Sequence, residues 1–415
     1  MRLPALVAAL VLAGACAPAD PEAGAQLTDA GTPSELRPLV EELVPRLERL
    51  SGLDREETLR VRRQTRAEAR AYVEQRLEKE MPAELREGVR RTYAALGLIP
   101  DTLDLDALLL DLYTEQVLGY YDPGTRTLYV VEGADPESLR PVLAHELVHA
   151  LQDQHTDLDS IVGRERGNDR QSAAHAAMEG HAMVVMFAVL AEQAAGATVD
   201  PAELASPAVA LGPALAAQNE QFPVFRRAPR IIQETLLFPY LGGAEFVHSV
   251  WTAISPQQRY PAPIDSLLPQ STEQVLRPLE RFVQHRDAPT ELRFDALPGR
   301  MVYENTLGQL ETGILLEQHL GAAARAYADG WDGDRYVLVS DEAGRDVLHW
   351  TSVWDSDAAA DAFAAAFERA ATLRPRRAVT IERIQVDGMP GVNVTDAPAG
   401  GPPVAARPAA RVTVQ

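Results

Sequence analysis

The sequence contains a single cysteine, Cys16, in 415 residues. A lone cysteine cannot form an intramolecular disulfide, so this fold would gain no disulfide cross-link even if the protein is exported from the cell. The chain is long enough for two or three domains, and its apolar and charged fractions are those of an ordinary globular protein. Stability therefore has to come from a hydrophobic core.

Basic residues are few compared with acidic ones, and the formal net charge is −21. A nucleic-acid-binding protein needs a basic surface that neutralises phosphates, so this balance argues against a nucleic-acid partner. It also argues against electrostatic adhesion to anionic lipid. The acidity otherwise indicates only that the chain should remain soluble.

Long hydrophobic runs are also scarce, and the apolar stretches beyond the N-terminus contain charges that exclude a predicted transmembrane helix. Residues 3–15 are apolar but too short to span a bilayer as a mature helix, and they follow a basic Arg2. The ending LAGAC resembles a bacterial lipoprotein signal, which implies lipidation of Cys16. Ala13 departs from the usual larger aliphatic residue, so simple trimming by a signal peptidase stays open. We expect export and a lipid anchor on the periplasmic or extracellular face.

The pattern of the chain predicts an α+β protein. Residues 17–33 are polar, small and proline-bearing, which is typical of a flexible tether. Residues 34–329 read as mainly helical, with a hairpin around Asp122-Pro123-Gly124. Residues 330–396 read as strand–strand–helix–strand–strand, which predicts a small second α+β domain. Residues 397–415 read as a low-complexity tail.

The segment HELVH places His145 and His149 one helical turn apart, so that both imidazoles can reach one ion. Glu146 lies about 100° further round the helix, where it could accept a proton from a metal-activated water. Zinc takes imidazole and carboxylate ligands, and a catalytic site keeps one coordination position open. Apolar neighbours on this helix would make unpaired histidines costly, which favours a metal site over a chance match.

Two residues compete for the role of third ligand. His155 has the spacing found in metzincins, but six residues rotate a helix by about 240°, away from the other ligands. Metzincins break the helix with a glycine, whereas this chain has Gln152 at that place. Glu179 lies in a second, very apolar helix, where a buried charge calls for a partner. We therefore expect Glu179 to be the ligand, and the alternative for it is a buried ion pair.

At this point the chain resembles the gluzincins, zinc peptidases whose third ligand is a glutamate from a downstream helix. It is most similar to a group of poorly characterised bacterial secreted and lipoprotein HExxH proteins with an E-G-x-A helix. The resemblance covers most of residues 95–340 and rests on GYYDPGTRTLYVV, HELVHALQDQH, MEGHA, FPYLGGAEFV, STEQVLRP and GWDGDRY. It implies a zincin-like domain with one Zn²⁺ per chain. It further implies that His145, His149 and Glu179 are ligands and Glu146 the general base. The gap between His149 and Glu179 is longer than in thermolysin-type relatives.

Four further residues are candidates for a supporting role. Asp153, one turn after His149, could orient a neighbour or accept a hydrogen bond from a ligand imidazole. Tyr240, beside an irregularity expected at Pro239, is a candidate for stabilising the charge of a transition state. His175 and His181 could be ligands or donors to a ligand, with ordinary packing as the alternative.

The function that these observations predict is a zinc-dependent peptidase tethered at the bacterial cell envelope and acting on a peptide or protein. In this reading the strand TLYVV (residues 127–131) would align an extended substrate as an edge strand. The alternatives are a non-catalytic binding or scaffold protein with a structural zinc, which would need a fourth ligand, and a hydrolase of another bond. The sequence does not indicate the oligomeric state.

Overall fold

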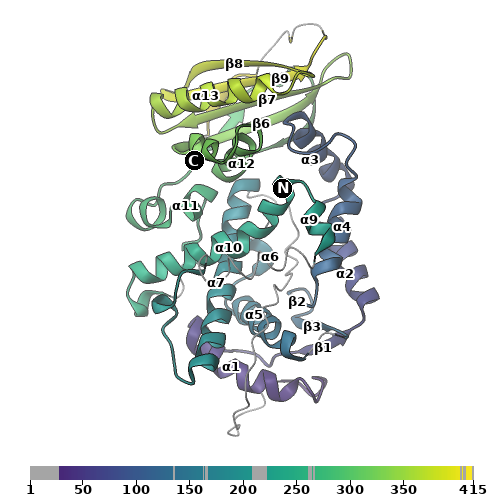
Figure 1. The fold of residues 1–415 in the computed structure, drawn as a ribbon, viewed down its shortest axis with the longest axis vertical. Helices are drawn as coiled ribbons and strands as arrows, with labels where there is room; N and C mark the ends of the chain where they lie inside the picture. The colour runs from purple at the N-terminus through teal and green to yellow at the C-terminus, as the bar shows by residue number, and fades with distance from the viewer. Residues whose placement is uncertain are drawn as a thin grey trace.

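The computed structural model describes residues 28–133, 136–161, 163, 167–207, 222–259, 264, 267–401, 404 and 408–413. The predicted signal peptide, with Cys16, and most of the predicted tether lie outside the described residues. The fold is α+β, as predicted, with a helical body and a separate sheet near the C-terminus (Figure 1).

The helical body is built from long and short helices, some of which have a side-chain cap at the N-terminus. Thr65, for example, forms a capping box with Glu68 at the start of the second long helix. The helices are α1 (Arg37–Ser51), α2 (Arg66–Glu80), α3 (Ala83–Ala95), α4 (Leu105–Gln116), α5 (Pro136–His155), α6 (Leu158–Ile161), α7 (Asn168–Ala195), α9 (Pro223–Arg227), α10 (Arg230–Ala253), α11 (Thr272–Leu276) and α12 (Gly308–Leu320), with a π-helix, η5 (Pro278–Gln284), and 3-10 turns η2 (Pro201–Glu203), η3 (Pro256–Gln258) and η6 (Ala322–Ala328).

Helices α5 and α7 lie at the centre of this body (Figure 1). Helix α7 is long and apolar enough to cross a membrane, judged by length and composition alone. However, 89% of its most apolar 18-residue segment is buried inside the fold. The helix is thus accounted for as the core helix that the sequence predicts. It begins at Asn168 and ends at Ala195, and the φ of 65° at the following Gly196 suits a glycine after a helix.

Two glycines allow α7 to approach α10 closely. A Cβ atom on Gly180 would lie 2.1 Å from the backbone carbonyl of Gly243, and a Cβ on Gly243 would lie 2.0 Å from the carbonyl oxygen of Ala176. Only glycine fits at both positions without moving backbone. Helix α10 runs unbroken through Pro239, so the irregularity expected there does not interrupt the helix.

The predicted hairpin is present as β2 (Gly119–Asp122) and β3 (Thr127–Val131), and β1 (Val61–Gln64) adds to it in parallel, giving the order β1-β3-β2. The TLYVV strand, β3, is therefore the middle strand of the sheet. Its predicted role as an edge strand for substrate is wrong, because both of its edges already pair with neighbours. The sequence could not show this, since β1 is far from β3 along the chain.

The C-terminal sheet has the order β5-β6-β7-β9-β8 and is antiparallel throughout, with α13 across one face (Figure 1). Its strand–strand–helix–strand–strand unit matches the expected one, while β5 precedes residue 330 and the tail contributes β10, which pairs with β4. The elements are β4 (Leu292–Phe294), β5 (Arg300–Asn305), β6 (Trp331–Ser340), β7 (Asp346–Trp354), α13 (Asp357–Thr372), β8 (Arg377–Val386), β9 (Met389–Pro398) and β10 (Ala410–Val412).

The GWDGDRY segment joins the sheet to the helical body through the buried carboxylate of Asp334. Its oxygens accept hydrogen bonds from the backbone N–H groups of Leu307 and Gly308 at the start of α12, each at 2.9 Å. They also accept from the indoles of Trp331 and Trp350, at 3.1 and 2.9 Å. A carboxylate at a helix N-terminus is favourable, so Asp334 ties the sheet to α12.

Candidate metal centre

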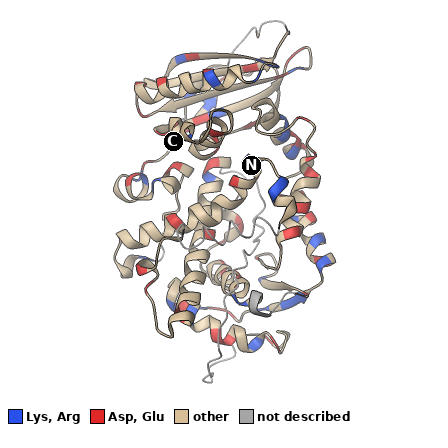
Figure 2. Cartoon of the chain, viewed as in Figure 1, with Lys and Arg blue, Asp and Glu red and all other residues tan. Residues whose placement is uncertain are grey.

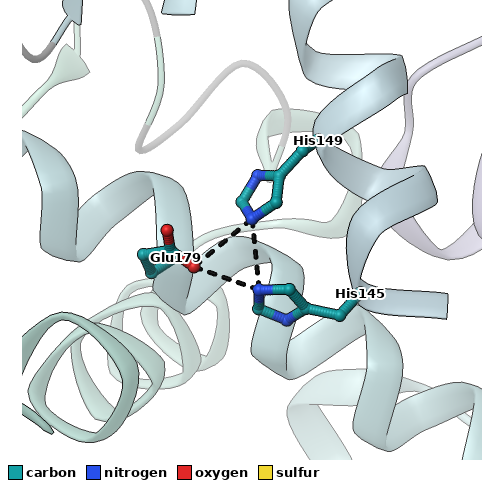
Figure 3. A group of neighbouring side chains, drawn as sticks. All are labelled: His145, His149 and Glu179. Carbon is teal, nitrogen blue, oxygen red and sulfur yellow. Dashed lines mark hydrogen bonds and ion pairs between the residues drawn. The ribbon is translucent and has the colours of Figure 1, made fainter. Parts of the chain in front are cut away.

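Two neighbouring helices bring the three predicted ligands together (Figure 3). Helix α5 presents His145 and His149 from successive turns, and α7 presents Glu179 opposite them. The Nε2 atoms of the two histidines are 3.1 Å apart, and Glu179 Oε2 lies 3.0 Å from that of His145 and 3.3 Å from that of His149. All three side chains are buried.

These distances fit the donor set of a tetrahedral zinc ion. Donor atoms about 2.0–2.1 Å from a tetrahedral metal lie about 3.3 Å from one another, close to each edge of the observed triangle. Two imidazole nitrogens with one carboxylate oxygen form a common catalytic zinc set. The group His145–His149–Glu179 could therefore hold a metal ion, with three protein donors among the described residues.

A chain of hydrogen bonds behind His149 fixes which of its nitrogens faces the metal position. The side-chain amide of Gln152 donates to the carbonyl oxygen of Met178 at 3.1 Å and to His181 Nδ1 at 2.9 Å. Its Oε1 must then accept from His149 Nδ1–H, at 2.7 Å. His149 Nε2 is thus directed toward Glu179, as a metal ligand requires.

The chain continues through His181 to the end of α1. Burial lowers the pKa of His181 to about 4, so the ring is neutral and carries one N–H. Since Nδ1 accepts from Gln152, the proton is on Nε2, which donates to the carbonyl oxygen of Ser51 at 3.3 Å. His181 is thus a supporting residue and lies away from the ligand group.

His175 holds the other side of the third ligand. Its Nε2 lies 3.1 Å from Glu179 Oε1, one helical turn along α7. Glu179 therefore turns Oε2 toward the two histidines of α5 and Oε1 toward His175. His175 thus contacts the oxygen of Glu179 that faces away from the two histidines of α5.

The electrostatics of the three donors suit a cation. Burial opposes the charge on Glu179, but the charge of His149 and hydrogen bonds from the histidines hold the pKa of Glu179 well below its ordinary value. Burial likewise opposes charge on His149, yet Glu179 raises the pKa of that imidazole. Burial lowers the pKa of His145 in spite of its hydrogen bond to Glu179. The carboxylate of Glu179 is therefore held in its anionic form, which a metal ligand requires.

Glu146 is fully buried beside this group, and one of its carboxylate oxygens accepts a hydrogen bond. The backbone N–H of Tyr121 in β2 donates to its Oε2 at 2.9 Å. Its Oε1 is buried and has no hydrogen-bond partner among the described residues. Burial, followed by the charge of Glu179, raises the pKa of Glu146 well above its ordinary value. An unpaired buried carboxylate oxygen is costly and is typical of functional sites.

The two remaining predicted residues occupy different places. Asp153 makes its hydrogen bond with the hydroxyl of Tyr121, which donates to Oδ2 at 2.8 Å. It therefore supports the strand residue that holds Glu146 and does not bond to an imidazole ligand directly. Tyr240 is buried on α10, with its ring centroid 6.1 Å from that of His145.

His155 lies away from the group, as its helical phase predicts. Helix α5 continues through it, and its Nε2 lies 2.7 Å from the carbonyl oxygen of Asp54. The sequence reasoning missed Gln152 and the backbone of Tyr121. A glutamine three residues after a ligand histidine, on the same helix, was the available signal for Gln152. Nothing local identifies the contact of Tyr121.

Comparison with known proteins adds little to this geometry. A family model described as a domain of unknown function (DUF8575) matches residues 295–414, which include the C-terminal sheet and exclude the metal group. No curated protein matches the chain. One solved structure, from Chloroflexus aurantiacus and described as "a putative hydrolase with a novel fold", is 18% identical over 60% of this chain and 88% of its own. Its TM-score of 0.33 is too low to support an argument.

Proposed function

We propose that this protein is a zinc-dependent hydrolase that cleaves peptide bonds. The observation that carries the proposal is the pairing of a three-donor group with a buried carboxylate that has an unpartnered oxygen. A structural zinc site is closed by four protein ligands, whereas the described residues supply three. The HELVH spacing supplies two of the donors and the carboxylate from a single helix.

In this proposal each side chain has a separate task. His145, His149 and Glu179 would hold the zinc, which when bound acts as a Lewis acid toward water and carbonyl oxygen. Glu146 accepts the proton of the attacking water on Oε1, while the N–H of Tyr121 keeps the other oxygen in place. The same carboxyl then returns the proton to the leaving amine. The hydroxyl of Tyr240 is our candidate donor to the oxyanion.

Two variants and one control test the proposal. Glu146→Gln should keep about one zinc per chain, measured by metal analysis, and lose turnover of a peptide library by about a hundredfold or more. Glu179→Gln should lose both zinc and turnover. Glu74→Gln, an exposed position on α2, serves as the matched control and should behave like the parent.

The outcomes separate this function from its alternative. A parent protein that holds zinc without hydrolysing any peptide would favour the binding or scaffold protein with a structural zinc. A protein that binds no zinc would overturn both proposals. Hydrolysis of an ester or amide other than a peptide would keep the chemistry and change the substrate.

We also propose that the protein is tethered at the cell envelope through a lipid on Cys16. The support is the sequence of the first sixteen residues alone. In cell fractionation the parent should partition with membranes, whereas Cys16→Ser should be released into the soluble fraction. Equal partitioning of the two would contradict the lipid anchor.

A further inference from the structure

A cavity lies between α3 and the C-terminal sheet, well outside the metal group. It has a volume of about 680 Å³, within the range of small-ligand sites. Five arginines line it, and we name them together the arginine cleft: Arg90, Arg91, Arg374, Arg376 and Arg377. In a chain with a net charge of −21 such a concentration of guanidinium groups needs an explanation. Figure 2 shows that acidic and basic residues are otherwise interspersed along the ribbon.

Part of this positive charge is balanced within the protein. Glu87 pairs with Arg90 at 2.7 Å, and Asp346 pairs with Arg91. The buried carboxylate of Asp396 is shared, because Arg374 and Arg377 each donate to it at 2.6 Å. Asp101 adds one more carboxylate to the lining.

After these ion pairs are formed, two of the arginines still have guanidinium N–H groups without a hydrogen-bond partner among the described residues. Arg376 is exposed, and its side chain has no hydrogen-bond partner among the described residues. Arg374 is only 7% exposed, yet its Nε and Nη2 atoms also lack partners among those residues. Its guanidinium lies over the ring of Phe367, with Cζ 5.4 Å from the ring centroid. Arg374 already pairs with Asp396, but this carboxylate is shared with Arg377, so the two guanidiniums together keep one uncompensated positive charge.

The charge of Arg374 is also felt by its surroundings. It adds to the effect of burial in lowering the pKa of His319, whose Nε2 lies 3.0 Å from the carbonyl oxygen of Leu96. The arginines come from two parts of the chain: one set lies on α3, and the other lies between the end of α13 and the first residue of β8.

We propose that the arginine cleft binds a phosphate group. A tetrahedral oxyanion offers acceptors in several directions and can bond to guanidiniums on both sides at once, which a flat carboxylate does less well. The proposal is independent of the metal centre. The same group could come from a free phosphate compound or from a lipid phosphate.

Calorimetric titration of the full chain with inorganic phosphate tests this directly. We expect one saturable site, weakened about tenfold or more in Arg376→Gln, since a charge-assisted hydrogen bond is lost. Asp346→Asn should instead tighten binding, because it releases Arg91 from its carboxylate. Arg300→Gln, an exposed arginine on β5, is the matched control and should leave binding unchanged. Vesicles containing phosphatidic acid form a second arm, and binding there in the absence of binding to free phosphate would assign the lipid source.

Several results would overturn the proposal. It fails if neither free phosphate nor the vesicles bind, or if succinate binds more tightly than phosphate. It also fails if phosphate binds but Arg376→Gln and Asp346→Asn leave the affinity at the parent value. The increase in phosphate affinity expected for Asp346→Asn is the most informative result, because misfolding of a variant cannot produce tighter binding.

Discussion

Gln152 offers a sharp test of how the fold prepares the metal centre. Replacing it with leucine keeps a similar volume but removes the acceptor of His149 Nδ1–H and the donor to Met178 O and His181 Nδ1. Three buried polar groups then lose their partner. At about 1 kcal/mol or more for each such group, the metal-free variant should lose about 3 kcal/mol of unfolding free energy.

Zinc affinity should fall separately from this loss of stability. Without Gln152, the ring of His149 is free to change its tautomer and orientation, and loss of such a supporting contact typically weakens metal binding about 10–100-fold. Competition with a chromophoric chelator measures the affinity, and urea denaturation of the metal-free protein measures the stability. Gln154→Leu is the matched control. Gln154 lies on the same helix, but its side-chain oxygen accepts hydrogen bonds from the backbone N–H groups of Glu56 and Glu57.

The result that would refute this reasoning is specific. If Gln152→Leu folds and binds zinc as tightly as the parent and as Gln154→Leu, the hydrogen-bond chain does not position His149. If both glutamine variants lose zinc affinity equally, the effect comes from α5 as a whole and not from the contact with His149.

Three further predictions follow from other parts of the fold. Gly180→Ala should destabilise the protein by about 2 kcal/mol or more in urea denaturation, because its Cβ would meet the backbone of Gly243; an unchanged midpoint would contradict the close packing of α7 on α10. His175→Phe should weaken zinc binding while Glu179 stays in place, and undiminished affinity would show that the contact with Oε1 is dispensable. Burial raises the pKa of Asp169 to about 7, so the folded state holds the extra proton and stability should fall as pH rises from about 4 to 7. Asp169→Asn should flatten that slope, measured as unfolding free energy against pH, and an unaltered slope would assign it to other groups.

The sequence predicted those parts of the site that depend on one helix. His145, Glu146 and His149 follow from the spacing of a single helix, and His155 could be set aside from its phase alone. Glu179 could be inferred because a charge in a very apolar helix needs a partner. The hairpin around Asp122-Pro123-Gly124 and the capping box at Thr65 also follow from neighbouring residues.

The parts that the sequence did not predict depend on contacts between distant segments. Asp153 had two expected roles, to orient a neighbour or to accept from a ligand imidazole, and its observed partner is the hydroxyl of Tyr121 from β2. The strand β3 was expected at an edge, but β1 pairs with it from the other side. In both cases the competing partner comes from another element, and local pattern carries no information about it.

The sequence by itself determined the chemistry available: His145, Glu146 and His149 on one helix, and Glu179 in a second, very apolar helix. Only the tertiary structure decided how these groups are used. The glycine contact between α7 and α10 fixes the place of the helix that bears Glu179, and the chain from Ser51 through His181 and Gln152 fixes the ring of His149. The reason is physical: helical periodicity sets which side chains share a face, whereas their partners are set by the packing of elements far apart in the chain.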